Sequence, residues 1–318
     1  MLEHNPTRTK TITENWFRDI NRRWKKFTSA TTKELNDQNK SSLATNAEFK
    51  FELDASQIRT YMVFFQSMID ELLLGSVEPP NWQAEYQLQS YTRGLERARA
   101  SLISQGADLV PTAAESFAAQ GLTSFTATST LGLSASLGPI HQDALEFLYI
   151  RSFNSMKKWT DAMTIETRGI LFDAVAQGKG IREVTDEIVD RIDVSRSRAQ
   201  LIARTETIQA YQRGSINEVI RAGGELDETL NVRWISALAP GRTRELHWQW
   251  HGDIITTEEA NRRIGVSPWN CLCAIVPVIE TPSLAKKNEK FAEEKKRFNG
   301  IETNSRQIRV NSIMHRLS

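Results

Sequence analysis

The segment from residue 201 to residue 278 restricts the fold of this chain more than any other. Its first part has the spacing of a helix, whose buried face we expect to hold Leu201, Ile208, Ser215 and Val219, flanked by Tyr211 and Ile216. Stretches with the composition of strands follow only at 232–236 and 273–278. Four of the eight tryptophans, two of the five histidines and both cysteines lie in this segment. We therefore predict a small α+β module at 201–281.

Helical periodicity dominates the rest of the chain. Apolar residues form a stripe from Trp16 to Phe27, and between Ile58 and Leu72 they recur at steps of four, three, four and three before Gly75. Further helices are predicted at 81–105, 141–177 and 181–192, and from a Ser195 cap to the glycines at 223–224. The predicted fold class is mainly α, with a helical N-terminal two thirds followed by the small α+β module.

These patterns divide the chain into five regions. A helical region (1–105) contains a polar loop at 36–47 and precedes an arm or loop rich in Ala, Ser and Thr (106–140). A second helical region (141–200), the α+β module (201–281) and a charged helical tail (282–318) follow. A structureless loop of about 30 residues is unusual inside a compact domain, so we expect the arm to contact a partner.

Composition narrows the class of protein. The 318 residues are 40% hydrophobic and 25% charged, which is typical of soluble globular proteins. No window approaches 18 consecutive apolar residues, and the first residues lack the apolar core of an export signal, so neither a membrane span nor export is expected. The two cysteines are too few for a disulfide framework and indicate folding in a reducing compartment.

Four side chains of the module have the chemistry of zinc ligands. If 242–251 is helical, His247 and His251 share one face, and Cys271 and Cys273 share one face of a strand edge. Two nitrogens and two sulfurs would complete a tetrahedral zinc site. The alternative is a packed histidine pair beside two buried thiols, and the C-x-C spacing is shorter than usual for zinc.

Charged residues of the long helix allow two interpretations. Arg204 and Glu206 either belong to a solvated face or hydrogen-bond the loops of the module. Catalysis by Glu206 is disfavoured, because no partner base, nucleophile or phosphate loop accompanies it. We expect no enzymatic activity.

Nucleic-acid chemistry is the main alternative. The basic cluster Arg22, Arg23, Lys25 and Lys26 is a candidate for non-specific contact with DNA, as are the pair at 262–263 and the tail. The set Arg242, Arg244, His247, His251 and Asn270 suggests a metal-dependent nuclease of the HNH type, but an asparagine in such a turn more often caps the backbone.

Four elements in order within 201–278 resemble the phage Mu F-like minor head proteins, a family of phage head morphogenesis. They are the string from Ile202 to Thr207 (I-A-R-T-E-T), then Gly224 with Trp234, then Arg244, His247 and Gly252, and finally 268–273 (P-W-N-C-L-C) with Pro277. Trp269 and Leu272 depart from the family pattern, and a C-x-x-C pair of many relatives is missing.

This resemblance implies a structural protein of a tailed-phage virion, located in the head interior or at the portal vertex after folding in the host cytoplasm. Its implied partners are the portal protein, the major capsid protein or scaffold, and packaged double-stranded DNA, with roles in head assembly, DNA packaging or ejection and no membrane during assembly. Zinc is the one cofactor to consider. The resemblance assigns structural roles to Arg204, Glu206, Trp234, Arg244, His247, Gly252, Asn270, Cys271 and Cys273.

Overall fold

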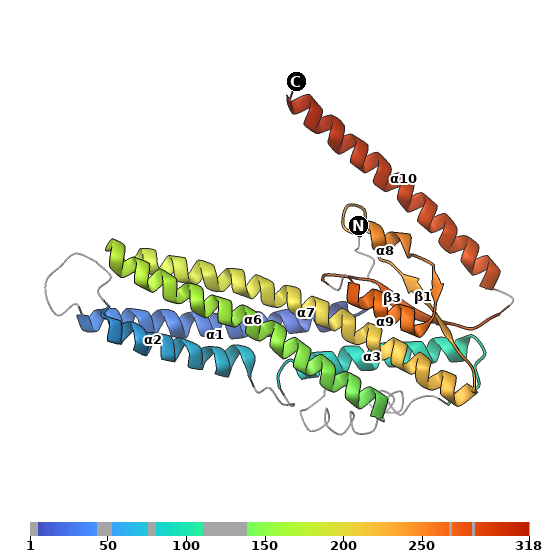
Figure 1. Ribbon diagram of the computed structural model, residues 1–318, viewed down its shortest axis with the longest axis horizontal. Coiled ribbons are helices and arrows are strands. Elements are labelled where there is room, and N and C mark those ends of the chain that lie inside the picture. Colours follow the sequence, from blue (N-terminus) through green and yellow to red (C-terminus); the bar gives the residue numbers. More distant parts are fainter. Residues whose placement is uncertain are drawn as a thin grey trace. The chain divides into compact units, whose positions relative to one another are not determined.

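The computed structural model describes residues 6–42, 53–75, 81–110, 139–266, 269–281 and 284–317, without the side chains of 39–42 and 304–317. The chain divides into two compact units. We call Thr13–Tyr86 with Glu146–Glu206 the helical unit, and Met1–Ile12 with Gln87–Leu145 and Thr207–Ser318 the mixed unit. Figure 1 shows the fold and labels most of its helices and strands.

The helical unit is built from long helices. They are most of α1 (Lys10–Ser42), α2 (Ala55–Met68) with the π-helical turn η1 (Ile69–Leu74), most of α6 (Pro139–Gln177) and the first part of α7 (Ile181–Leu226). The predicted stripe on α1 is confirmed, because Trp16, Ile20, Trp24 and Phe27 are all buried in its core.

Local sequence explains where α2 begins and where η1, which continues it, ends. The Asp54 side chain accepts hydrogen bonds from the backbone of Ser56 and Gln57, and the Gln57 side chain bonds back to Asp54, which forms a capping box. At the end of η1, which continues α2, Gly75 has a φ of +70°, a left-handed conformation that glycine adopts without strain. The helix predicted from the four-three periodicity is therefore confirmed.

The prediction of a helix cap at Ser195 is wrong. Ser195 is buried in the middle of α7, which runs unbroken from Ile181 to Leu226. Buried residues recur there at steps of three and four: Val184, Ile188, Ile192, Ser195, Ala199 and Ile202. Because this packing face continues through Ser195, its tertiary contacts outweigh the capping tendency of serine.

The mixed unit contains most of α3 (Ala84–Ser104), the last part of α7 and the elements that follow α7. These are β1 (Asn231–Ile235), α8 (Glu245–Gln249), β2 (Ile254–Ile255), α9 (Thr257–Val266), β3 (Ala274–Val278) and α10 (Leu284–Leu317). Strands β1 and β3 confirm the two predicted strands, while β2 and α9 were not predicted. Two strand residues and a ten-residue helix carry little periodic signal.

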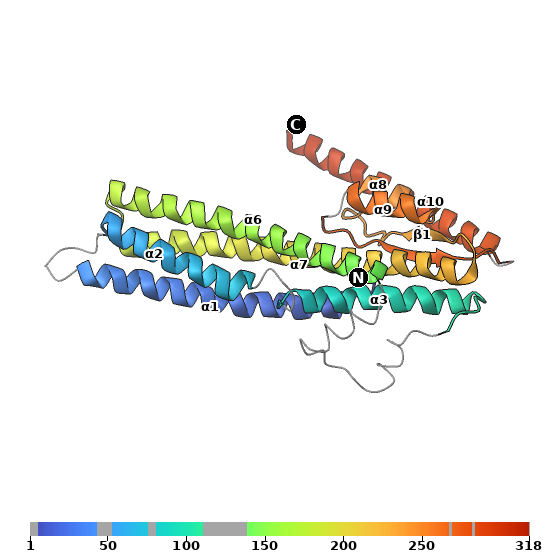
Figure 2. The ribbon, with the colours of Figure 1, turned by 60° about the horizontal axis from the view of Figure 1, so that its bottom comes forward.

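In the described residues the sheet has three antiparallel strands in the order β2-β1-β3. Val232 pairs with Ile255 on one side and with Pro277 on the other. Pro277 has no N–H to donate, and its place on the edge strand β3 tolerates this loss. Figure 2 shows β1 lying along the C-terminal part of α7.

Helix α7 is hydrogen-bonded directly to the segment that forms β3. The Gln212 side chain donates to the Cys273 carbonyl at 2.7 Å, and the Ser215 hydroxyl donates to the Ile275 carbonyl at 2.8 Å. Around them Ile216, Val219 and Trp234 form a common core. These contacts place the loop 269–273 against a rigid helix.

Several local predictions need correction. Leu201, predicted to be buried, is exposed, although the other predicted residues of that α7 face are buried. Helix α1 continues to Ser42 through the first part of the predicted loop, where Gln38 hydrogen-bonds Glu34 one turn earlier. Helix α10 runs to Leu317, within the predicted charged helical tail (282–318). Most of the predicted arm, 111–138, lies outside the described residues, as does 43–47 of the loop.

The fold class is as predicted: mainly helical, with a small antiparallel sheet among helices near the C-terminus. None of the described helices combines the length and the apolar character needed to cross a membrane. The division of the chain into five regions remains a prediction from the sequence.

Candidate metal centre

Three of the four predicted zinc ligands lie together in the mixed unit. His247 comes from the short helix α8, and Cys271 and Cys273 come from the loop that precedes β3. The His247 Nδ1 atom is 3.4 Å from the Sγ atom of each cysteine. The three ligand atoms all lie within 4.8 Å of one another, and all three side chains are buried.

Aromatic rings and the Ser236 hydroxyl surround the cluster. The His247 ring stacks on Trp250 at 5.6 Å and meets the edge of Trp234 at 6.0 Å. The Ser236 hydroxyl donates to the His247 carbonyl and lies 3.6 Å from the Cys273 thiol. The end of β1 therefore holds α8 and the cysteine loop in one place.

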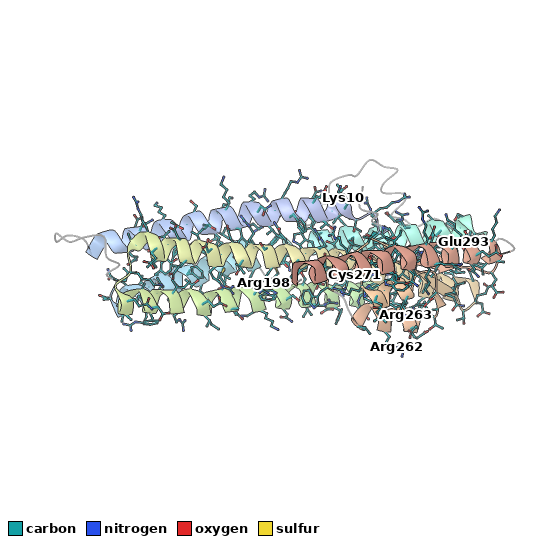
Figure 3. The ribbon with its side chains drawn as sticks, turned by 90° about the horizontal axis from the view of Figure 1, so that it is seen from above. Lys10, Arg198, Arg262, Arg263, Cys271 and Glu293 are labelled. Carbon is teal, nitrogen blue, oxygen red and sulfur yellow. The ribbon has the colours of Figure 1, made fainter. Side chains whose placement is uncertain are left out.

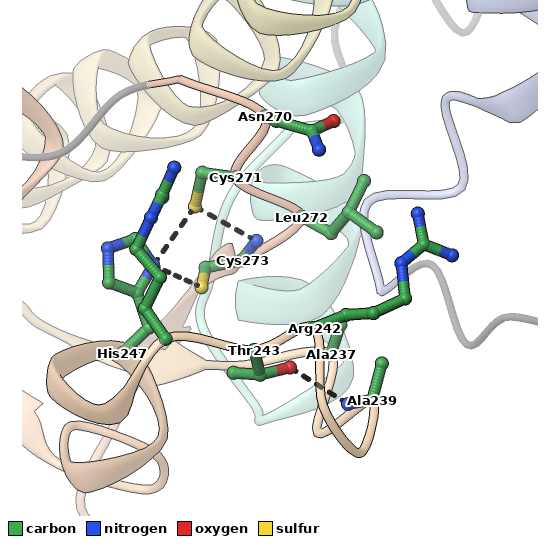
Figure 4. Close-up of a pocket in the computed structure, with 10 residues that line it drawn as sticks. Ala237, Ala239, Arg242, Thr243, His247, Asn270, Cys271, Leu272 and Cys273 are labelled. Carbon is green, nitrogen blue, oxygen red and sulfur yellow. Dashed lines mark hydrogen bonds between the residues drawn. The ribbon is translucent and has the colours of Figure 1, made fainter. Parts of the chain in front are cut away.

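A small cavity of about 50 Å³ adjoins the cluster. Figure 4 shows His247 and the two cysteines facing one another, while Arg242, Thr243 and Asn270 line the cavity beside them. This volume is sufficient for an ion or a water molecule and too small for an organic substrate.

The two thiols are not equivalent. A hydrogen bond from Cys273 lowers the pKa of Cys271 well below its ordinary value against the opposing effect of burial, and the His247 ring lowers it further. Burial raises the pKa of Cys273, and the neighbouring Cys271 raises it further. Cys271 is therefore the thiol that reaches the thiolate state more readily, which is the form that binds metal.

The three residues fit a zinc ion. Thiolate sulfur and imidazole nitrogen are donors that zinc prefers, and ligand atoms about 2.0–2.3 Å from a tetrahedral ion lie roughly 3.5 Å from one another. The 3.4 Å distances between Nδ1 and each Sγ match that spacing. Among the described residues, no further His, Cys, Asp or Glu joins this group. The cluster is thus able to hold a metal such as zinc through three protein ligands.

His251, the fourth predicted ligand, has other partners. Helix α8 ends at Gln249, so the two histidines do not share a helical face as the sequence predicted. The His251 Nδ1 atom accepts a hydrogen bond from the Ser236 backbone N–H at 3.1 Å, and Nε2 lies 3.1 Å from a Glu294 oxygen. Burial lowers the pKa of His251, and Glu294 opposes this effect. His251 links β1 to α10.

Other motif residues have structural contacts. Gly252 has a φ of +86°, and a Cβ atom at this position would lie 2.6 Å from Cβ of Phe291. The Arg244 side chain donates to the Trp269 carbonyl. Asn270 has a φ of +54°, a conformation in which asparagine is enriched, and this turn directs the chain into the cysteine loop. Pro268 lies outside the described residues.

The motif residues of α7 lie in the helical unit. Glu206 is fully buried and forms an ion pair with Arg151 of α6 at 3.3 Å, so a solvated face is wrong for this residue. The Arg204 guanidinium lies 5.4 Å from the Phe17 ring. Both contacts connect helices of the same unit.

The basic cluster of α1 is not uniformly available to a ligand. Arg23 stacks over Trp82, donates to the Leu72 carbonyl and pairs with Asp19, so it supports the fold. Arg22, Lys25 and Lys26 are exposed, although Arg22 also pairs with Asp19. Of the pair at 262–263, Arg263 lies over Trp250, while Arg262 points outward from α9 (Figure 3) and pairs with Glu259.

The sequence did not predict the residues that bond the cluster and His251. Ser236, Gln212 and Glu294 each bond a candidate ligand or its backbone. The signal for Gln212 was present, because it is a polar residue on the apolar face of a helix. Glu294 carries no such signal, since it resembles the other charges of α10.

Comparison with known proteins adds one match. No curated protein and no solved structure is significantly similar to the chain. Residues 165–276 match the family described as phage Mu protein F like protein, from α6 to β3. This range contains the candidate metal centre and the motif residues of α7. Residues 165–276 therefore form a domain of the phage Mu protein F like family, a family of phage head morphogenesis proteins.

Proposed function

We propose that this chain is a non-enzymatic structural protein of a tailed-phage head, associated with the portal or the inner capsid. The observation that carries the proposal is the family match over 165–276. The proposed partners are the portal protein and the major capsid protein or scaffold, and the proposed role is in head assembly and in DNA packaging or ejection.

Burial of the motif residues supports a structural role. Glu206, His247, Cys271 and Cys273, the side chains with most catalytic potential, are all buried. The cavity beside the cysteines, of about 50 Å³, is too small to admit a nucleotide. These residues connect helices and strands, which favours a rigid component of an assembly over a metal-dependent nuclease.

Composition of purified particles tests this proposal. Tailed-phage particles from cells that encode the chain should contain it at low copy number by mass spectrometry, and chemical cross-linking should join it to portal or capsid protein. Detection in the lysate but never in particles or proheads would contradict the proposal. Plasmid nicking that requires divalent metal and is lost in His247→Ala would favour the nuclease instead.

We further propose that the cluster binds zinc and that the ion has a structural role. Zinc would join α8 to the cysteine loop, so its removal by a chelator should lower the thermal stability of the protein. Elemental analysis of the purified chain should find about one zinc per molecule, and Cys271→Ser with Cys273→Ser should abolish binding.

A control variant distinguishes a zinc site with three protein ligands from one with four. His251→Gln should retain zinc, because His251 bonds Ser236 and Glu294 in the structure. Loss of zinc in this variant would show that His251 is a fourth ligand. Absence of zinc from the wild-type chain, purified without chelator, would contradict the proposal and indicate that the two thiols form a hydrogen-bonded pair without a metal.

Non-specific contact with DNA is a second candidate, favoured by one groove. Lys25, Lys33 and Arg196 line a groove of about 720 Å³ in the helical unit, beside the hydroxyl groups of Thr28 and Ser29. Phosphate contacts by such residues weaken steeply as salt rises. A gel-shift series should show this dependence, and Lys25→Glu with Lys33→Glu should weaken binding. DNA binding that does not weaken as salt rises would contradict this candidate function.

A further inference from the structure

A second groove of the helical unit, of about 610 Å³, lies between α2 and α6. The two helices run side by side (Figures 1 and 2), and the Thr164 hydroxyl is 3.3 Å from the Gln66 side-chain oxygen where they meet. This groove is distinct from the metal centre and from the lysine-lined groove, because none of its lining residues belongs to either.

The groove has an apolar floor and an apolar rim. Ile58 and Met62 of α2 are buried at its base. On the rim Val63 is 72% exposed and Phe172 is 52% exposed, and Ile165, next to the lining residue Thr164, is 69% exposed. Large apolar side chains exposed along one groove are typical of a binding surface.

The walls of the groove have the shape of a helix-binding site. The lining residues on α2 extend from Ala55 to Gln66, and those on α6 recur every fourth residue from Thr164 to Phe172. At a rise of about 1.5 Å per residue, the α2 wall is roughly 16 Å long, which is about three helical turns. Both walls are helices, whose backbone groups bond along the helix, so an added strand would find no sheet edge to pair with.

The positive charge of the groove indicates which kind of partner it would bind. Arg59 on α2 and Arg168 on α6 line the groove and are exposed, and no ion pair involves either of them among the described residues. Residues three and four positions away on each helix are uncharged, so no pair within the helix is available to them. No acidic residue of the described part of the chain lines the groove.

We propose that this groove binds an acidic amphipathic helix of a partner protein. The apolar face of that helix would cover Val63 and Phe172, and its flanking carboxylates would pair with Arg59 and Arg168. Two copies of this chain meeting through the same groove would bring like charges together, which disfavours self-association. The inference rests on the groove alone and does not depend on the proposed function.

A displayed library of helical peptides tests the proposal with the full chain. Each peptide carries leucines at helical spacing along one face, and its flanking positions vary among Glu, Lys, Gln and Ser. Selection on the wild-type chain should enrich Glu at the flanking positions. Selection on the double variant Arg59→Glu and Arg168→Glu should enrich Lys instead, and a selected acidic peptide should bind this variant at least tenfold more weakly.

Matched variants separate the groove from general surface effects. Val63→Ser with Phe172→Ser should abolish enrichment, whereas Val194→Ser and Arg182→Glu, at exposed positions of α7 outside the groove, should preserve it. Circular dichroism verifies that each variant keeps its helical content. No enrichment on the wild-type chain, or identical peptides from wild-type and groove variants, would overturn the proposal. So would a dimer of the chain that Val63→Ser dissociates, because the occupant would then be a second copy.

Discussion

At the scale of single residues, His141 shows how burial controls protonation. It is buried in the mixed unit, where its Nδ1 atom is 2.8 Å from the Tyr91 hydroxyl and its Nε2 atom is 3.9 Å from Glu218. Burial, with a smaller contribution from Arg221, lowers the pKa of His141 from 6.5 to about 4. The folded protein therefore favours the neutral ring.

This lowered pKa predicts a loss of stability in acid. Neutral His141 stabilises the fold fully above pH 6.5, the unfolded value, and this contribution is lost as the pH falls towards 4. The difference between the two pKa values corresponds to at most about 3 kcal/mol. Urea unfolding at pH 7.5 and pH 4.5 should show a larger loss for the wild type than for His141→Gln.

The comparison with His141→Gln is needed because a neighbour acts in the opposite direction. Burial raises the pKa of Glu218, with Arg99 opposing this effect, so protonation of its carboxyl group in acid favours the folded state. Both proteins contain Glu218, so its effect is common to them. Equal losses in the two proteins would show that His141 does not titrate as predicted.

At the scale of elements, two glycines allow α3 and α7 to cross closely. A Cβ atom on Gly94 would lie 2.0 Å from the Tyr211 carbonyl oxygen, and one on Gly214 would lie 2.1 Å from the Tyr91 carbonyl oxygen. Each glycine thus faces the backbone of the other helix, and the contact is reciprocal. No side-chain movement can relieve such a clash.

Substitution at this crossing should be severe. Gly214→Ala should destabilise the protein by about 3 kcal/mol or more, because one helix must move away from the other. Gly224→Ala, on the same helix with open space around it, should change stability by less than about 1 kcal/mol. Equal midpoints of denaturant unfolding for the two variants would contradict the close crossing.

Helix α10 packs on the turn that follows α8. Phe291 lies against Gly252 and His251, and its ring carries the Arg233 guanidinium at 4.5 Å. Three residues further along, Glu294 reaches His251. The predicted charged helical tail therefore has one face with specific contacts.

Gly252→Ala should separate α10 from this turn. The added Cβ meets Phe291 at 2.6 Å, and a φ of +86° is itself strained for alanine, so we expect a cost of about 2–4 kcal/mol. Proteolysis within 284–303 should accelerate in this variant. Gly265→Ala on α9, with nothing within 4 Å, is the control, and equal cleavage rates would disprove the contact.

At the scale of the whole molecule, the residues that the structure describes form two separate hydrophobic cores. Trp24 is buried in the core of the helical unit and Trp234 in that of the mixed unit. Cores built from different residues allow the two units to differ in their local stability. The family domain spans both units, because 165–206 belongs to one and 207–276 to the other.

Loss of either tryptophan should therefore act locally. Trp234→Ala should cost about 3–5 kcal/mol and increase amide hydrogen exchange first in β1, α8 and β3. Trp24→Ala should increase amide hydrogen exchange first in α1 and α2. Hydrogen-exchange mass spectrometry measures both, and each variant is the control for the other. The same increase throughout the chain in both variants would show a single cooperative unit.

Local patterns in the sequence were sufficient for much of the fold. The periodicity between Trp16 and Phe27, the spacing before Gly75 and the composition around Trp234 each depend on neighbouring residues, so the corresponding elements were predicted. The approach of His247 to the two cysteines was also predicted from residue types. Propensity and periodicity act over a few residues, and a sequence records them directly.

The features that the sequence did not predict depend on packing between distant segments. Ser195 has the chemistry of a cap, yet the continuous packing face of α7 buries it. His251 resembles His247 in sequence, but the end of α8 directs it to Ser236 and Glu294. The Gln212 contact with Cys273 spans 61 residues, and the groove between α2 and α6 joins segments about 100 residues apart. Such contacts depend on where distant segments meet in space, which the order of residues along the chain does not state.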